Sequence, residues 1–200
     1  MKRICVFCGS SPGIGQAYLE TAQQMGRALA EKRISLVYGG AKVGVMGRLA
    51  RSCLEAGGEV IGVIPRSLVE LEVACREISR LLVVESMHER KAKMAELSDG
   101  FIALPGGLGT IEEFFEMLTW AQLGMHRKPC GLLNTARYFD RLLDFLDHAV
   151  EQQFVEAAHR EMIQVGECPE DLLAKFETYR PPQVNKTAWV LRMTDKANGA

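Results

Sequence analysis

The chain has 200 residues, 48% of them hydrophobic and 24% charged, and a net charge of -1 with both signs scattered along the sequence. This length and composition predict one globular domain with a sizeable core. The near-neutral charge argues against a nucleic-acid binder, and no apolar run approaches the roughly 20 residues of a membrane span. The N-terminal run MKRICVFCGSS is too brief for a signal peptide, so we expect a cytoplasmic protein.

Short β-type runs alternate with helical patterns along the whole chain. Apolar runs predict strands at residues 3–9, 34–40, 59–65, 80–86, 100–107, 128–134 and 162–167. Apolar stripes at helical spacing predict helices around residues 18–29 and 46–54, and over residues 87–98, 110–123, 137–152 and 169–178. Residues 66–78 fit neither pattern clearly.

The strand runs are continuously apolar rather than alternating, which indicates burial on both faces and hence a parallel sheet covered by helices. The pattern predicts an α/β fold, a Rossmann-like doubly wound parallel sheet of about six or seven strands with helices on both faces. We expect a single domain over residues 1–180. Residues 181–200 are polar and lack periodicity, so a weakly ordered C-terminal tail is expected.

The six cysteines do not form a metal-binding or redox pattern. Cys5 and Cys8 make a CxxC inside the apolar run ICVFC, but positions three apart on a strand point to opposite faces of a sheet. The other four are scattered without ligand spacing, at Cys53, Cys75, Cys130 and Cys168. We therefore expect reduced core cysteines and no metal site.

Three predicted strands end in glycine-rich turns, at residues 8–15, 38–47 and 105–110. Ligands of such sheets bind outside the carboxyl ends of the strands, and each turn leads into a helix whose free N–H groups favour an anion. None of the turns has the GxGxxG or P-loop fingerprint. Any one of them is equally well explained as a tight strand-to-helix turn. All three at one sheet edge favour a small ligand that carries a phosphate.

The sequence TIEE at residues 110–113 reads as a helix-capping box, with Thr110 as the cap and Glu113 reaching back. That structural role competes with a functional one. Glu113 lies beside the expected anion site, where a carboxylate repels phosphate unless it addresses another part of the ligand, such as sugar hydroxyls. Ser86 and Glu89 form a second capping box.

Arg90 lies on the inner stripe of the helix at residues 87–98, together with Met87, Met94 and Leu97. A buried arginine is costly unless it is paired. One interpretation is that Arg90 extends past the methionines to water. The alternative, functional interpretation is that Arg90 points into the crevice at the strand ends, toward Glu113 and a ligand phosphate or base.

The motifs PGGLGTIEE (105–113), MHERK (87–91) and LTWAQLGMHRKPCGLLN (118–134), with the early CGSS and YGG turns, resemble the LONELY GUY (LOG) family. The resemblance covers about residues 3–165. It implies a Rossmann-like homodimer that hydrolyses the N-glycosidic bond of nucleoside 5'-monophosphates, either cytokinin nucleotides or AMP. The implied products are free base and ribose 5-phosphate, and no cofactor is implied.

The resemblance places the two catalytic roles on Arg90 and Glu113. A carboxylate near the ribose stabilises oxocarbenium character or activates water, and an arginine holds the phosphate or the leaving base. The predicted substrate-binding residues are Ser10, Gly40, Met87, Lys91, Gly106, Gly107, Leu108, Gly109, Thr110, Ile111, Glu112 and Thr119.

Two other functions remain open at this point. A non-catalytic nucleotide-binding regulatory module on the same fold needs the glycine turns but does not need Arg90 and Glu113 together. A decarboxylase needs a cofactor-bearing lysine in a pocket, for which Lys91 is the obvious candidate. The residues favour neither adenine nor an N6-substituted adenine as the base.

Overall fold

The computed structural model describes residues 1–70, 74–182 and 189. Within them, seven parallel strands form one sheet in the order β4-β3-β2-β1-β5-β6-β7. The predicted α/β, Rossmann-like sheet is thereby confirmed. The strands are β1 (Arg3–Phe7), β2 (Ser35–Tyr38), β3 (Val60–Pro65), β4 (Arg80–Val84), β5 (Gly100–Ala103), β6 (Cys130–Leu133) and β7 (Ile163–Gly166).

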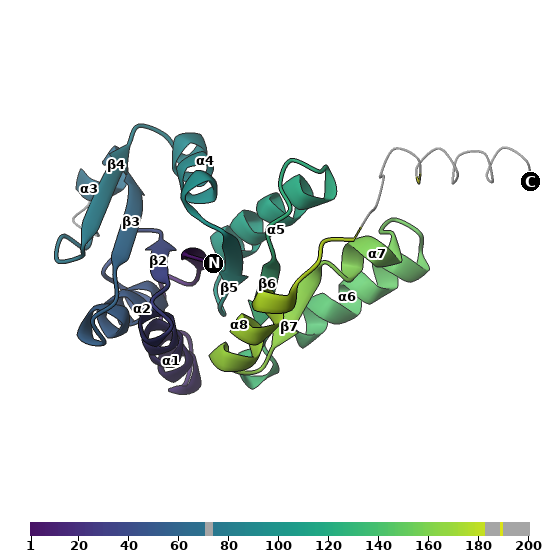
Figure 1. Ribbon diagram of the computed structural model, residues 1–200, viewed down its shortest axis with the longest axis horizontal. Helices are drawn as coiled ribbons and strands as arrows, with labels where there is room; N and C mark the ends of the chain where they lie inside the picture. The colour runs from purple at the N-terminus through teal and green to yellow at the C-terminus, as the bar shows by residue number, and fades with distance from the viewer. Residues whose placement is uncertain (71–73, 183–188, 190–200) are drawn as a thin grey trace, which may run out of the picture.

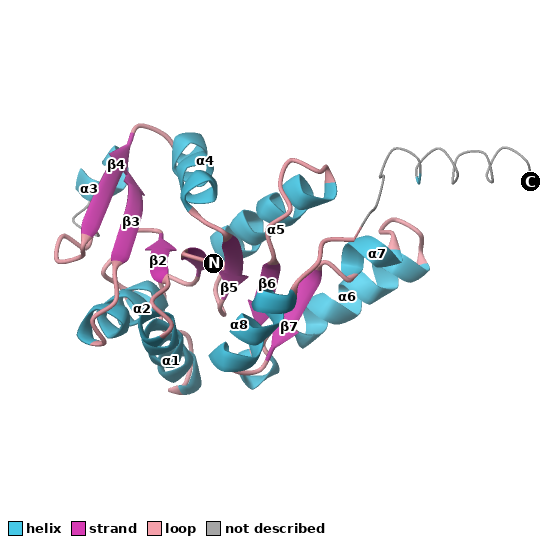
Figure 2. Cartoon of the chain, in the orientation of Figure 1, coloured by secondary structure: helices cyan, strands magenta, loops and turns pink. Residues whose placement is uncertain are grey.

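Helices cover both faces of the sheet (Figure 2). One apolar cluster joins the sheet to α1, α2 and α8, and a second joins the opposite face to α4, α5 and α6. No helix among the described residues is both long and apolar enough to cross a bilayer. The helices are α1 (Ala17–Glu31), α2 (Gly44–Glu55), α3 (Arg66–Glu70), α4 (Met87–Leu97), α5 (Leu108–Gln122), α6 (Asp140–Glu151), α7 (Ala157–Arg160) and α8 (Pro169–Thr178).

The chain reverses its winding between β1 and β5, which are neighbours at the centre of the sheet (Figure 1). From β1 the chain continues to α1 on one face, and from β5 it continues to α5 on the other. Helices that leave adjacent strands toward opposite faces open a crevice at the carboxyl ends of those strands. The ligand site is therefore expected at the turns after β1 and β5.

Predicted and observed elements differ at several places, and α7 has no counterpart among the predicted helices. The helix expected over 110–123 begins at Leu108, and the one expected from residue 137 begins at Asp140, because Thr135–Arg137 forms a 3-10 turn. The ambiguous stretch at 66–78 contains α3 and a bridge between Ala41 and Ala74. Residues 71–73 lie outside the described residues.

The predicted core placement is confirmed for four of the six cysteines, Cys5, Cys8, Cys53 and Cys130. Cys5 packs in the cluster beneath α4 and α5, while Cys8 packs on the opposite face, so the two thiols do not face each other. All six cysteines are free, but Cys75 is half-buried and Cys168 is exposed. The expectation of core cysteines is therefore wrong for Cys168, which precedes α8 at the surface.

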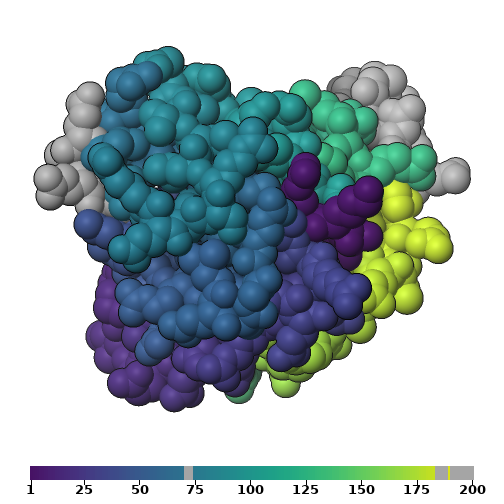
Figure 3. Space-filling model, turned by 60° about the vertical axis from the view of Figure 1, so that its left-hand side comes forward, coloured from purple at the N-terminus to yellow at the C-terminus, as the bar shows by residue number. Residues whose placement is uncertain are grey.

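The N-terminal residues and the C-terminal part of the described chain are both exposed on the face seen in Figure 3. Lys32 Nζ, at the end of α1, lies 3.0 Å from Glu177 Oε1 of α8. The expected tail at 181–200 falls mostly outside the described residues. Its weak order and the domain boundary at residue 180 stay predictions.

Candidate active site

A cleft of about 500 Å³ lies at the carboxyl ends of the central strands, as the winding of the sheet predicts. The turn after β1 contributes Gly9 and Ser10, and the turn after β2 contributes Gly39. The first turn of α5 forms another wall, and Arg90 of α4 faces it. This volume suits a small ligand of nucleotide size.

The start of α5 has no side-chain cap. Its N-cap is Gly107, which has no side chain to accept from the first N–H groups. Thr110 is already the third residue of the helix and is 4% exposed, so the predicted capping box at residues 110–113 is wrong. The unpaired N–H groups expected in the first turn of a helix and the positive end of its dipole therefore favour an anion at this end of the cleft.

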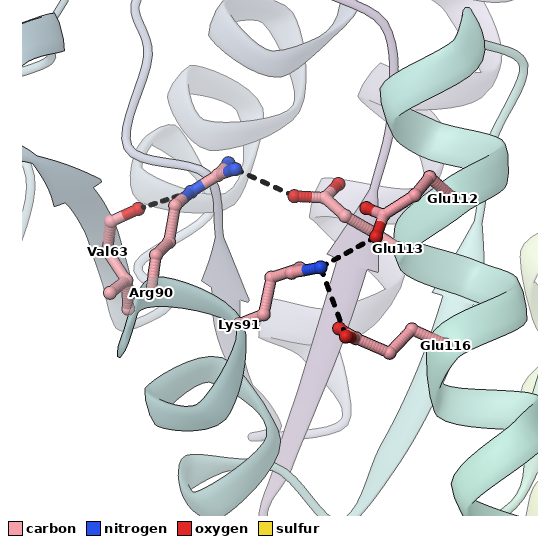
Figure 4. A network of polar contacts seen from close by, with 6 residues as sticks. All are labelled: Val63, Arg90, Lys91, Glu112, Glu113 and Glu116. Atoms are coloured by element: carbon pink, nitrogen blue, oxygen red, sulfur yellow. Dashed lines mark hydrogen bonds and ion pairs between the residues drawn. The ribbon is translucent and has the colours of Figure 1, made fainter. Parts of the chain in front are cut away.

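Arg90 and Glu113 form a buried ion pair between α4 and α5 (Figure 4). Arg90 Nη1 donates to Glu113 Oε1 at 2.7 Å, and Arg90 Nε donates to the carbonyl of Val63 at 3.1 Å. Each of the two residues is 8% exposed. The expectation that Arg90 points toward Glu113 is confirmed, and the interpretation that Arg90 extends to water is wrong.

Gly39 makes room for the guanidinium of Arg90. A Cβ on Gly39 would overlap Arg90 Nη2 and lie 3.1 Å from Met46 Sδ. The sequence singled out the neighbouring Gly40 instead, which does not line the cleft. Gly40 has φ +78°, and a Cβ there would lie 3.0 Å from Ile64 Cβ, so its glycine serves the turn itself.

The environment of Glu113 favours a more basic carboxylate. Burial raises the pKa of Glu113 above its ordinary value of 4.5, and the neighbouring charge of Glu112 raises it further. The guanidinium of Arg90 and the ammonium of Lys91 oppose the rise without cancelling it. A raised pKa is typical of a carboxyl group that exchanges protons near neutral pH.

Lys91 is committed to two carboxylates on α5 (Figure 4). Its ammonium lies 2.6 Å from Glu112 Oε1 and 3.0 Å from Glu116 Oε1, and its hydrogen bond to Glu112 is the main reason that its pKa is raised. A Schiff-base lysine needs the opposite, a pKa lowered by burial or by neighbouring cations. Among the described residues that line the cleft, none is a lysine.

The predicted site residues divide into two groups. Besides Arg90 and Glu113, the cleft is lined by seven of the predicted substrate-binding residues: Ser10, Met87, Gly107, Leu108, Gly109, Thr110 and Glu112. The remaining five do not line it: Gly40, Lys91, Gly106, Ile111 and Thr119. Thr119 is exposed and lies two helical turns beyond Glu112 on α5. Substrate contacts by these five stay predictions.

Sequence analysis missed several residues of the cleft, including Gly9, Gly39, Met46 and Ile64. Gly9 and Gly39 belong to glycine-rich turns that the sequence did identify, so those turn motifs were the signal that could have predicted both residues. In the described part of the chain, no three His, Cys, Asp or Glu side chains gather closely enough to hold a metal ion. The arrangement offers an anion site at the start of α5 beside a buried carboxylate.

Comparison with known proteins identifies the family. Residues 46–176 match a family model described as "Possible lysine decarboxylase". The cytokinin riboside 5'-monophosphate phosphoribohydrolase of Rhodococcoides fascians is 51% identical over 178 residues, which cover 88% of this chain and 90% of that protein. The chain belongs to the LONELY GUY (LOG) family. A second LOG relative, the phosphoribohydrolase LOG7 of Arabidopsis thaliana, is 48% identical over 90% of this chain and 83% of its own.

Solved structures of proteins that are not named as LOG enzymes share the fold. A molybdenum cofactor binding protein from Rippkaea orientalis has a TM-score of 0.67 at 23% identity, covering 89% of this chain and 97% of its own. The molybdenum cofactor carrier protein of Chlamydomonas reinhardtii has a TM-score of 0.66 at 22% identity, over 88% and 96%. These likenesses support the Rossmann-type fold alone, so the function of this LOG member must be argued from its site.

Proposed function

We propose that this LOG-family protein hydrolyses the N-glycosidic bond of purine riboside 5'-monophosphates and releases free base and ribose 5-phosphate. The observation that carries the proposal is the buried Arg90–Glu113 pair in the wall of the cleft, beside the uncapped start of α5. The relatives from Rhodococcoides fascians and Arabidopsis thaliana are cytokinin riboside 5'-monophosphate phosphoribohydrolases by name, which supports the same reaction.

The proposed binding mode puts the 5'-phosphate on the N–H groups of Gly107 and the first turn of α5. The ribose then lies next to Glu113, with its anomeric carbon close to the carboxylate. This order reconciles a phosphate site with an adjacent carboxylate, because Glu113 faces the sugar and not the phosphate.

In the proposed reaction the bond between the anomeric carbon and the base nitrogen breaks, and the base leaves with the bonding electron pair. Positive charge develops on the ribose ring, and the Glu113 carboxylate stabilises it. A water molecule adds its oxygen to the anomeric carbon. One water proton passes to Glu113 and on to the base nitrogen, so the products are neutral base and ribose 5-phosphate.

Arg90 has two roles in this proposal. Its ion pair at 2.7 Å fixes the orientation of the Glu113 carboxylate and favours the ionised form that a base requires. Burying both charges is costly, and a purely structural pair is often replaceable by apolar residues. A pair that borders a ligand cleft, as this one does, is better explained by chemistry than by stability.

The oligomeric state, the AMP substrate, the location and the metal independence are supported by separate arguments. The homodimer rests on the family resemblance, and AMP as a substrate rests on the resemblance and the size of the cleft. The cytoplasmic location is supported by six free cysteines, the state expected in a reducing compartment. The absence of a metal requirement is supported by the carboxylate chemistry above, which needs no Lewis acid.

The deciding experiment is a panel of purine nucleoside 5'-monophosphates, including AMP and N6-substituted AMP, with released bases separated by chromatography. We expect base and ribose 5-phosphate in equal amounts, undiminished by a chelator. The matched negative control is the Glu113→Gln protein. If the wild-type protein binds these nucleotides but releases no base from any of them, a non-catalytic nucleotide-binding module is the correct function.

A further inference from the structure

The glycine turn that precedes α5 is hydrogen-bonded to a tyrosine from a segment that is distant in the sequence. Tyr138 follows β6 in the chain, 32 residues after Gly106, and its hydroxyl donates to the Gly106 carbonyl at 2.6 Å. Tyr138 does not line the ligand cleft; it lines an adjacent cavity of about 300 Å³, which shares Gly9, Ser10 and Gly107 with the cleft. The hydrogen bond therefore holds the turn from a residue that is not part of the cleft wall.

The bonded carbonyl shares a peptide unit with a proposed phosphate donor. The C=O of Gly106 and the N–H of Gly107 belong to one planar trans peptide, in which they point in opposite directions. Drawing the carbonyl toward Tyr138 therefore directs the Gly107 N–H away from Tyr138. Gly107 lines both the cleft and the cavity beside Tyr138, whereas Gly106 lines only the latter, so an N–H that points away from Tyr138 points toward the cleft.

This peptide unit is unusually free to rotate, because it lies between two glycines. Gly106 cannot carry a side chain, since a Cβ there would overlap Thr110 Oγ1 and lie 2.8 Å from Gly9 N. Gly107 also lacks a Cβ, so neither residue beside this peptide unit limits its backbone angles sterically. Rotation of the unit by half a turn would present a carbonyl oxygen to the phosphate in place of an N–H, and the two oxygens would repel each other.

The segment that presents Tyr138 is strained. The two residues before it, Ala136 and Arg137, have φ +50° and +60°, a left-handed conformation that is unfavourable for residues with a Cβ. The Asn134 side chain holds the segment closed: its Oδ1 accepts from Phe139 N at 2.7 Å and its Nδ2 donates to Asp140 Oδ1 at 2.8 Å. Such strain persists where the surroundings require a particular placement.

Tyr138 also braces the turn after β1. Its ring meets Tyr18 edge to face, with centroids 5.8 Å apart and planes at 78°. Tyr18 in turn packs against Gly13, where a Cβ would lie 2.8 Å from Tyr18 Cδ2. Tyr138 itself is 43% exposed, so its placement is not explained by burial in the core.

We propose that Tyr138 is a positioning residue for the phosphate-binding turn: its hydroxyl locks the Gly106–Gly107 peptide with the Gly107 N–H directed into the cleft. The inference rests on the proposed function and assigns no contact between Tyr138 and the substrate. The hydroxyl and the phosphate act on opposite ends of the same peptide unit.

Tyr138→Phe tests the proposal, because it keeps the ring and its contact with Tyr18 but removes the hydroxyl. We expect the KM for AMP to rise about five- to tenfold, the loss typical of one hydrogen bond, with kcat changed by less than about twofold. The Kd of ribose 5-phosphate, measured by calorimetry, should rise by the same factor, and the melting temperature should stay within a few degrees of the parent.

The matched control is Tyr18→Phe, which removes a hydroxyl from the other ring of the pair and should leave KM and Kd unchanged. A Tyr138→Phe protein with parental KM and parental Kd would overturn the proposal. A Tyr138→Phe protein with a lower melting temperature and an unchanged Kd would also overturn it, because the hydrogen bond would then only stabilise the fold.

Ribose 5-phosphate binding also separates this inference from the proposed function. If the wild-type protein releases no base, the hydrolase proposal fails, yet a weaker Kd in Tyr138→Phe still supports the role of Tyr138. If the wild-type protein does not bind ribose 5-phosphate, the positioning role is overturned as well.

Discussion

Glu113 has a raised pKa although Arg90 donates to it at 2.7 Å, because the burial of the carboxyl group outweighs the favourable charge of the guanidinium. The two residues come from different helices, 23 positions apart in the chain. Burial makes the carboxylate more basic, and the ion pair keeps it oriented and favours ionisation. A general base for hydrolysis near neutral pH requires this combination.

Replacement of Glu113 by glutamine should abolish most of the activity without unfolding the protein. Glutamine has nearly the same shape and can still accept from Arg90, but it has no charge and cannot take a proton. We expect kcat to fall by about 10²- to 10⁴-fold, the range for a positioned acid or base. Initial rates of base release from AMP give the measurement.

The control for this variant is its AMP affinity. Binding of AMP by the Glu113→Gln protein should stay close to that of the parent, because the phosphate contacts come from the start of α5. Near-normal turnover would mean that Glu113 has only a structural role, and the reaction proposed above would then be wrong.

The raised pKa of Glu113 predicts an acidic limb in the rate profile. The ionised carboxylate is the active form, so kcat/KM should fall as the pH falls through a pKa that lies above the ordinary 4.5 of glutamate. The phosphate of AMP also titrates, near pH 6. Assigning the acidic limb to Glu113 therefore requires a variant with a changed Glu113 pKa, measured with the same substrate.

Glu112→Gln is that variant. The charge of Glu112 raises the pKa of Glu113, so its removal should move the acidic limb to lower pH while the contribution of AMP stays fixed. A limb that stays in place or moves to higher pH would show that another group controls it.

Two adjacent glycines should respond differently to the same substitution. Gly39→Ala introduces a Cβ where Arg90 Nη2 lies, so the guanidinium that pairs with Glu113 must shift from its present position. Displacement of a positioning group by about 1 Å can cost 10²-fold in rate, and we expect a loss of about that size with little change in melting temperature.

Gly40→Ala is the matched comparison. Gly40 has φ +78°, and its Cβ would press on Ile64, so this variant should lose stability, by about 1 kcal/mol or more. Thermal unfolding and AMP turnover of both proteins separate the two effects. Equal loss of stability in both variants would contradict the role given to Gly39.

The sequence predicts the sheet well because its strands are apolar runs bounded by glycine and polar residues. It also predicts Arg90, because a cation on a helical stripe between methionines requires a partner. The start of α5 is mispredicted since Thr110 and Glu113 have the spacing of a capping box, while the side chain of Glu113 turns instead to a residue 23 positions away. Nothing local in YGG distinguishes the glycine that faces Arg90 from the one that shapes the turn.

The 5'-phosphate should be required for efficient turnover. The first turn of α5 lines the cleft, and no side chain caps its N–H groups. A nucleoside leaves them unused, and the binding energy of a remote group serves to orient the reacting bond. AMP and adenosine are to be compared by kcat/KM. Similar values for the two substrates would mean that the turn does not bind phosphate.

Leu108 allows a direct test of where the phosphate lies. It is the first residue of α5, it lines the cleft, and it is 90% exposed, so substitutions there disturb no packing. Leu108→Glu places a negative charge beside the proposed phosphate. A repulsion of about 1 kcal/mol, as for unit charges about 4 Å apart in water, predicts a KM for AMP raised about fivefold at low salt.

The same carboxylate should not destabilise the protein, because an acidic residue in the first turn of a helix is favourable, by about 0.3–1 kcal/mol. Leu108→Gln, of similar size but neutral, is the control and should keep the parental KM. Since salt screens exposed charges, the difference between the glutamate and glutamine variants should shrink as ionic strength rises toward about 1 M. If the two variants have the same KM at every salt concentration, the phosphate does not bind at the start of α5.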